Sequence, residues 1–240
     1  MKYKNIVVGK FVYRENRFIA QCEVKGKIER AHVRNTGRCA ELLVPGVVAY
    51  LQYAPADNRK TEYTLLAVQK GNKTVNLDSL APNRLVLEYL RDGGILPGME
   101  QPASHLRGEV KYGDSRLDFA FLSGRKQAYA EVKGVTLERE GIAYFPDAPT
   151  LRGIRHMREL CRAKIEGALA YLILVIQMEG ILSFAPNYAT HPEFAAALKE
   201  AKQQGVTILA LGCRVFGDGL ELAQRVPVNL EDRSSLLWKQ

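Results

Sequence analysis

The stretch EVKYGDSRLDFAFLSGRKQAYAEVK, residues 109–133, decides the fold of the second half of the chain. Its apolar residues fall into three short runs, at residues 109–113, 116–122 and 127–135. The turns between these runs contain glycine, aspartate and serine, which is typical of strands joined by tight hairpins. The stretch therefore predicts three consecutive strands of one sheet.

Three charged side chains interrupt this apolar pattern. Asp118 lies in an otherwise apolar strand, and Glu131 and Lys133 are two positions apart on the next strand, so they point to the same face. A carboxylate in an apolar strand is costly to bury unless something compensates for its charge. Two acids and a lysine on one face can hold a divalent cation, and oxygen ligands suit Mg²⁺ or Mn²⁺. A cross-strand ion pair that only stabilises the sheet is the alternative.

Asp118, followed after a hairpin by Glu131-Val132-Lys133, resembles the D…(D/E)xK core of the PD-(D/E)XK nuclease superfamily. Longer sequence motifs accompany this core: GDSRLDF at 113–119, AEVKGVTL at 130–137, FPDAPTLRGIRHMREL at 145–160, VYRENRF at 12–18 and AHVRNTG at 31–37. Together they resemble the sugar fermentation stimulation protein A (SfsA) family, from about residue 11 to residue 212. The resemblance implies an α/β (α+β) protein with two domains. An OB-like β-barrel would occupy residues 1–80, and a mixed-sheet, nuclease-like αβββαβ domain would occupy residues 81–240.

The SfsA family is described as DNA-binding, with a proposed regulatory role in sugar (maltose) metabolism. The resemblance implies a metal-dependent nuclease in which Asp118, Glu131 and Lys133 are catalytic. Asp118 and Glu131 would bind Mg²⁺ or Mn²⁺, with the Val132 carbonyl and Glu109 as further ligands. Lys133 would hold the attacking water or neutralise charge on the phosphate. The alternative is a non-catalytic, largely nonspecific DNA-binding regulator that keeps the same architecture. No cluster of aromatic residues supports a sugar-sensing module.

Composition is compatible with these readings. The 240 residues are 47% hydrophobic and 25% charged, and the net charge of +8 favours an anionic partner, nucleic acid before membrane. The first residues, MKYKNIVVGKFVYREN, are interrupted by charge too early for a signal peptide, and no apolar run has spanning length. The four cysteines form no CxxC pair, which argues against a zinc site or a disulfide framework. We therefore expect a cytoplasmic protein.

Short strands and turns fill the N-terminal third. The expected strands are residues 6–13, 18–24, 27–33, 47–53, 63–69 and 74–77. They suggest an OB-like barrel, which suits nucleic acid, although a compact SH3-like barrel gives the same pattern. A hinge is expected at residues 80–83.

After the hinge we expect a helix from Asn83 to about residue 92, in which Glu88 could add an acid to the metal site. Residues 94–107 are expected to form a loop that could lie over that site. Residues 138–149 are a segment with Gly141 and two prolines, in which residues 145–147 are expected to form a turn. A helix over residues 151–167, capped by Thr150, is expected to follow. Its expected buried stripe consists of Ile154, Met157, Cys161 and Ile165.

The rest of the chain predicts a central strand at 168–177, buried on both faces, then a helix at 192–204 and a strand at 206–213. Residues 217–240 are expected to form an irregular tail, which Leu236, Leu237 and Trp238 could dock.

Basic and aromatic side chains form a candidate nucleic-acid surface: Arg14, Arg17, Phe18, His32, Arg34, Arg116, Arg152, Arg155 and His156. The density of arginine in the helix after Thr150 fits contacts with phosphates. A solvated amphipathic face, or a Phe18 that belongs to the core, explains the same residues without a ligand. His156 and Glu159 share one side of that helix and could pair with each other or reach the metal site, and Asp147 is a further weak candidate acid. The sequence does not distinguish DNA from RNA, or single strands from double strands. It also does not determine the mode of cleavage or the oligomeric state, for which a homodimer is one possibility.

Overall fold

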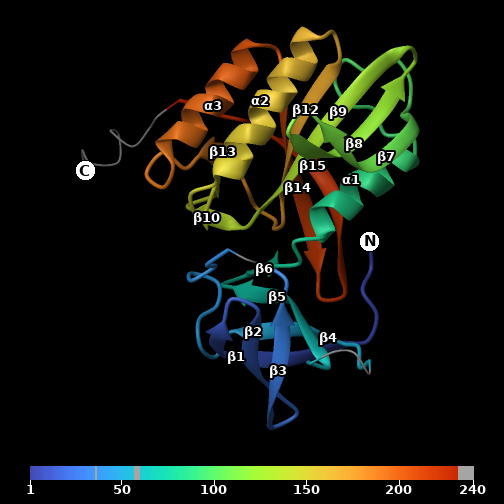
Figure 1. The fold of residues 1–240 in the computed structure, drawn as a ribbon. Helices are drawn as coiled ribbons and strands as arrows, with labels where there is room; N and C mark the ends of the chain where they lie inside the picture. The colour runs from blue at the N-terminus through green and yellow to red at the C-terminus, as the bar shows by residue number, and fades with distance from the viewer. Residues whose placement is uncertain (36, 57–59, 232–240) are drawn as a thin grey trace.

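The structure is a computed structural model that describes residues 1–35, 37–56 and 60–231. A strand barrel formed by the early part of the chain lies below a sheet with helices on both faces in Figure 1. None of the helices within the described ranges is long and apolar enough to cross a membrane.

The first part of the chain is a closed barrel. Its strands are β1 Ile6–Asn16, β2 Ile19–Val24, β3 Lys27–Val33, β4 Val48–Tyr53, β5 Tyr63–Lys70 and β6 Lys73–Asn76. They are hydrogen-bonded in the order β3-β2-β1-β4-β5-β6, and a parallel pairing of β3 with β5 closes the first five strands. Strand β2 illustrates how the sequence forms the core of the barrel. Its Ala20, Cys22 and Val24 alternate with more polar positions and are buried. The predicted N-terminal barrel is confirmed.

The second part of the chain is a mixed sheet. Its strands run in the order β15-β14-β12-β9-β8-β7, with β12 parallel to both of its neighbours. Their bounds are β7 Ser104–Tyr112, β8 Ser115–Ser123, β9 Lys126–Val135, β12 Leu169–Ile176, β14 Thr207–Phe216 and β15 Gly219–Val226. Strand β12 is buried along nearly its whole length, as its apolar sequence predicted. A smaller sheet pairs β10 Leu137–Arg139, β11 Ile142–Phe145 and β13 Ser183–Pro186.

Three helices cover the large sheet. Helix α1 Ala81–Arg91 lies on one face, and helices α2 Leu151–Ile165 and α3 Pro192–Gln203 lie on the other (Figure 1). Leu85, Val86 and Leu90 of α1 are buried against the sheet, and Tyr89 is half-buried. The Thr150 hydroxyl accepts a hydrogen bond from the Gly153 N–H at 3.0 Å, which confirms the predicted cap of α2.

Four expectations about elements are wrong. Residues 138–149, where no strand was expected, contain β11 and most of β10, and the predicted tail contains β15, an edge strand paired with β14. Residues 104–107 of the expected loop are the start of β7, and Leu96 and Met99 pack into the core with α1. Ile165 is 76% exposed and lies outside the buried stripe of α2, since the helix ends there. The expectation for Leu236, Leu237 and Trp238 falls outside the described residues.

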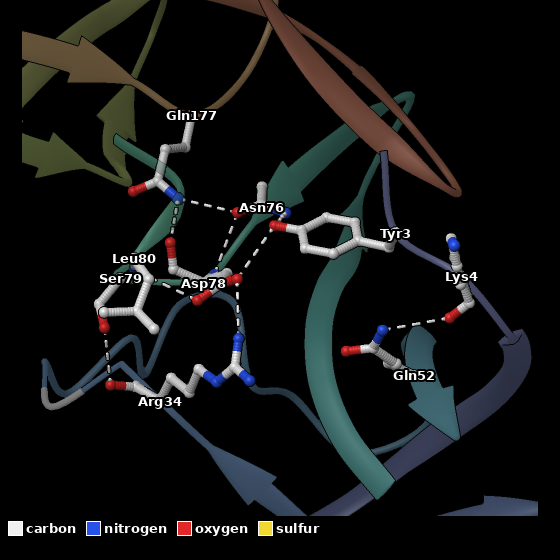
Figure 2. Close-up of polar contacts among 9 residues, drawn as sticks. All are labelled: Tyr3, Lys4, Arg34, Gln52, Asn76, Asp78, Ser79, Leu80 and Gln177. Carbon is white, nitrogen blue, oxygen red and sulfur yellow. Dashed lines mark hydrogen bonds and ion pairs between the residues drawn. The ribbon is translucent and has the colours of Figure 1, made fainter. Parts of the chain in front are cut away.

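A buried polar network joins the barrel to the sheet (Figure 2). Asp78 is fully buried and accepts hydrogen bonds from the Tyr3 hydroxyl at 3.2 Å and from Arg34 Nη1 at 3.1 Å. Gln177, at the end of β12, donates to the Asn76 side chain at 2.9 Å and to the Asp78 carbonyl at 3.1 Å. The expected hinge at residues 80–83 directly follows this network and includes the start of α1. The chain just before it is held by satisfied buried hydrogen bonds.

Candidate functional site

The predicted acids meet where strands β8 and β9 separate. The ladder between these strands runs from Ser123↔Lys126 to Phe119↔Ala130 and ends there. Beyond that point the Asp118 carboxylate replaces a backbone partner, because Val132 donates its N–H to Asp118 Oδ2 at 2.7 Å. The missing ladder bonds leave room between the two strands for the Asp118 side chain.

Helix α1 fixes the other oxygen of Asp118. Asn83, in the first turn of α1, donates from Nδ2 to Asp118 Oδ1 at 2.9 Å. From the sequence, Asn83 is expected only as the start of the helix, and Glu88 is the acid that this helix could add. Glu88 instead lies 3.2 Å from the N-terminal amine. The position of Asn83, a polar residue at the start of the helix that precedes the sheet, was the one sequence feature that could have indicated its contact with Asp118.

Glu131 is buried on the face covered by α2, with an exposed fraction of 1%. Its Oε1 contacts both Lys133 Nζ and His156 Nδ1. Arg152 donates from Nε to His156 Nε2 at 3.3 Å, so the geometry favours a proton on Nδ1 that His156 donates to Glu131. The structure thus gives His156 a place against Glu131, whereas Glu159 accepts from the backbone N–H of Asp114 at 3.2 Å.

The second oxygen of Glu131, Oε2, is buried and has no hydrogen-bond partner among the described residues. A native structure rarely leaves a buried carboxylate oxygen unpaired, so such an atom calls for an explanation such as an ion or an ordered water. The donor set is therefore compatible with a divalent cation at this oxygen.

The two carboxylates influence each other's ionisation. Burial and the charge of Glu131 raise the pKa of Asp118 above its ordinary value, despite the Val132 N–H and Lys133. Burial acts to raise the pKa of Glu131 as well, but the hydrogen bond from His156 and the charge of Lys133 outweigh it and hold that pKa below its ordinary value. Opposed shifts in two neighbouring acids are common at functional sites.

The site would offer a cation few protein ligands. The described residues contain no cluster of three or more His, Cys, Asp and Glu side chains that could hold a metal ion. An ion bound by Asp118 and Glu131 would complete its shell with water and backbone oxygen, as Mg²⁺ commonly does. Glu109 is exposed on β7, and no contact in the described part of the chain joins it to Asp118 or Glu131. The Val132 carbonyl stays a predicted ligand.

The barrel residues predicted to bind nucleic acid separate into two groups. Arg14 donates to four backbone carbonyls, those of Arg17, Asn35, Gly37 and Arg38, at 2.6–2.9 Å. Arg34 pairs with the buried Asp78. Arg17 and Phe18 are exposed at the β1–β2 turn, where they can meet a ligand, and His32 lies half-buried on β3.

Further basic residues lie on β8 and α2, the elements that carry Asp118 and His156. Arg116 is exposed on β8, two residues before Asp118. Arg152 and Arg155 are exposed on α2, and Arg152 also contacts His156. The site therefore combines a buried acidic centre with exposed positive charge beside it, a distribution that attracts an anionic substrate.

Comparisons with known proteins agree over almost the whole chain. The family described as "SfsA N-terminal OB domain" matches residues 12–77, and "Sugar fermentation stimulation protein RE domain" matches residues 80–219. A "Sugar fermentation stimulation protein homolog" of Desulfitobacterium hafniense (strain Y51) is 49% identical over 230 residues, which cover 96% of this chain and 99% of the relative. A homologue from Ruminiclostridium cellulolyticum is 47% identical over 230 residues, which cover 96% of this chain and 100% of the relative.

A solved structure has the same architecture. "The structure of Pyrococcus Furiosus SfsA in complex with Ca2+" superposes with a TM-score of 0.85 at 29% identity, over 95% of this chain and 98% of that one. The predicted fold class is confirmed by this match together with the matching OB-domain family.

Proposed function

The chain belongs to the sugar fermentation stimulation protein (SfsA) family, and from this premise we propose that it is a DNA-binding, metal-dependent nuclease that hydrolyses phosphodiester bonds. The observation that carries the proposal is the unpartnered, buried Oε2 of Glu131 beside Asp118 and Lys133. A purely structural ion pair would not need Asp118 as a second, half-buried acid whose pKa is raised by burial and by Glu131.

A divalent cation is the group that these residues fit. Mg²⁺ or Mn²⁺ bound here would supply a Lewis acid for the phosphate and lower the pKa of an attacking water. The relative from Pyrococcus furiosus is in complex with Ca²⁺, which supports an oxygen-ligand site for a hard cation. Asp118 and Glu131 would hold the ion, with Glu109 and the Val132 carbonyl as additional predicted ligands.

The chain's own residues then have distinct roles. Asn83 and the Val132 N–H fix the two oxygens of Asp118. His156, on α2, holds Glu131 through Oε1, and Oε2 is left without a hydrogen-bond partner among the described residues. Lys133 neutralises charge that develops on the phosphate or holds the water that attacks it. The exposed Arg116, Arg152 and Arg155 would contact neighbouring phosphates of the substrate.

The barrel is the second binding surface in this proposal. Phe18 is 51% exposed and Tyr13 is 52% exposed, with Arg17 next to Phe18. Exposed aromatic rings beside arginine suit the stacking of unpaired bases and contact with the backbone. This surface serves a nuclease and a non-catalytic DNA-binding regulator equally well.

The test is a cleavage assay with labelled single- and double-stranded DNA and RNA in Mg²⁺, Mn²⁺ or EDTA. Asp118→Asn and Lys133→Ala proteins are purified identically, so that contaminating nucleases appear in every sample. Lys126→Ala, an exposed lysine on the same strand β9, is the matched control. We expect metal-dependent cleavage by the wild type and the control, and none by the two site variants.

Lys133→Ala should also bind nucleic acid almost as well as the wild type, because its ammonium contacts Glu131 in the resting site. A large loss of binding would show that Lys133 is a phosphate contact. Binding without cleavage by every protein, in all of the cations, would overturn the nuclease and leave the DNA-binding regulator.

A further inference from the structure

A polar cavity of about 160 Å³ lies where the barrel meets the sheet, and the proposed metal site does not use it. It is lined from both parts of the molecule. The lining residues that matter here are Asn35, Gly37, Gly134, Thr136, Tyr144 and Asp147. A cavity of this size has room for about five waters at about 30 Å³ each, which corresponds to one planar ring system rather than a whole nucleotide.

The barrel side of the cavity is preformed. Arg14 donates to the carbonyls of Asn35 and Gly37 at 2.8 and 2.7 Å, and Asn35 Oδ1 accepts from the Gly37 N–H at 2.8 Å. Gly37 is needed for space, because a side chain there would overlap the Asp147 carboxylate. A wall held by these hydrogen bonds costs little to order when a ligand enters.

Two of the residues that line the cavity are close in sequence to residues of the candidate site. Gly134 directly follows Lys133 on β9. Asp147 precedes the Thr150 cap by three residues, and that cap begins the helix that carries His156. Lys133 and the cavity lining are therefore neighbours along β9, with Gly134 itself in the lining.

The chemistry of the lining selects the part of the polymer that enters. Asp147 is half-buried and has no hydrogen-bond partner within the described ranges, so it offers acceptor oxygens to a ligand. A carboxylate repels phosphate, but it accepts well from the exocyclic amino group of cytosine. The Tyr144 ring provides an apolar wall of the kind on which bases stack.

We infer that the cavity formed by Asn35, Gly37 and Asp147 receives an unpaired base next to the scissile phosphate and prefers a base with an exocyclic amino group over thymine. This inference rests on the proposed function. It makes the substrate a single strand, or a strand with an extruded base, because the amino edge is paired in an intact duplex.

The test measures the binding of labelled oligo-dC and oligo-dT of equal length by fluorescence anisotropy at pH 8 in EDTA. The ratio of their cleavage rates in Mg²⁺ is measured in parallel. The wild type should prefer dC by about tenfold, the usual scale for one charged hydrogen bond to a base. Asp147→Asn should lose most of this preference, because its new amide N–H₂ donates to the thymine carbonyl. Glu41→Gln, an exposed acid on the barrel, should keep the preference.

A second variant guards against local misfolding at Asp147. Asp147→Ala, which removes the acceptor without adding a donor, should equalise dC and dT, while both variants melt as cooperatively as the wild type. A folded Asp147→Asn protein with the wild-type preference, or a wild type that binds dC and dT equally, would overturn the inference alone. Failure to bind or cleave either oligonucleotide in any cation would overturn the proposed function itself.

Discussion

At the scale of single residues, Glu131 is where the charges of the site converge. Both of its positive or proton-donating neighbours, Lys133 and His156, contact the same oxygen, Oε1. The other oxygen is therefore left buried and unpaired. This asymmetry distinguishes the cluster from a closed structural salt bridge, in which every lone pair would be satisfied. One oxygen holds the side chain in place, and the proposed function assigns the other to the metal ion.

His156→Ala tests how far the imidazole holds Glu131. The substitution removes a donor from a carboxylate that is 1% exposed, so we expect the free energy of unfolding to fall by roughly 1–3 kcal/mol in urea titrations with EDTA. Arg155→Ala, an exposed residue one position earlier on α2, should change it by less than about 0.5 kcal/mol. Equal losses in the two variants would mean that the contact between His156 and Glu131 adds nothing to stability.

At the scale of elements, Arg14 is an internal brace of the barrel. Its guanidinium donates to four carbonyls from the β1–β2 turn and from the residues after β3, and its Nε is buried without a partner in the described part of the chain. Sequence reasoning placed Arg14 on the nucleic-acid surface because arginine beside an aromatic residue fits both roles. Only the folded barrel shows that its donors are directed inward.

Replacing Arg14 by alanine should therefore act first on stability. We expect Arg14→Ala to lower the free energy of unfolding by roughly 2 kcal/mol, because several carbonyls lose a charged donor at once. Arg17→Ala, at an exposed position in the next turn, should leave stability within about 0.5 kcal/mol while weakening nucleic-acid binding. Urea unfolding and anisotropy titrations of both variants separate the two roles. Unchanged stability in Arg14→Ala would refute the brace.

The elements that sequence patterns predicted are those with strong periodicity. Alternation identified the barrel strands, and the apolar run identified β12 as a buried central strand. Strand β15 was missed because its residues GLELAQRV are mostly exposed at a sheet edge and carry little alternation. Strand β13 has only four residues, which is too short for a period to show.

The candidate site was predictable only in part. Asp118, Glu131 and Lys133 stand out because charge interrupts an apolar strand pattern, and the structure brings them together. Asn83 and the contact of His156 with Glu131 depend on how two helices pack against the sheet, which no local pattern encodes. Glu109 shares the strand pattern but lies exposed at a position with a positive φ of 52°.

At the scale of the whole molecule, two polar clusters fix the barrel against the sheet. One is the Asp78 network of Figure 2. The other places Glu138 of β10 against two barrel lysines, with Lys70 Nζ at 2.7 Å and Lys73 Nζ at 3.5 Å from its carboxylate oxygens. A fixed junction matters for the proposed function, because a substrate that spans the barrel and the acids needs both surfaces in one orientation.

Glu138→Gln should weaken this junction in a pH-dependent way. Burial acts to raise the pKa of Glu138, but Lys70 and the Gly141 N–H outweigh it and hold that pKa below its ordinary value. A lowered pKa means that the ionised acid stabilises the folded state above its ordinary pKa, and that this contribution is lost as pH falls through the folded value.

The variant should therefore be less stable than the wild type by about 1–2 kcal/mol at pH 7, and the difference should shrink below about pH 4. Urea titrations at several pH values measure this, with the exposed Glu140→Gln in the same hairpin as the control. A difference that stays constant with pH would show that the charge of Glu138 is not its source.

The most direct test of the central claim is a calorimetric titration of metal-free protein with Mn²⁺. The account predicts one ion per chain in the wild type, and the same in Asp114→Asn, whose exposed carboxylate lies in the turn before β8. Asp118→Asn should lose this binding, because it removes one of the two carboxylates proposed to hold the ion. Equal Mn²⁺ binding by Asp118→Asn and the wild type would contradict the account, since the ion would then lie elsewhere.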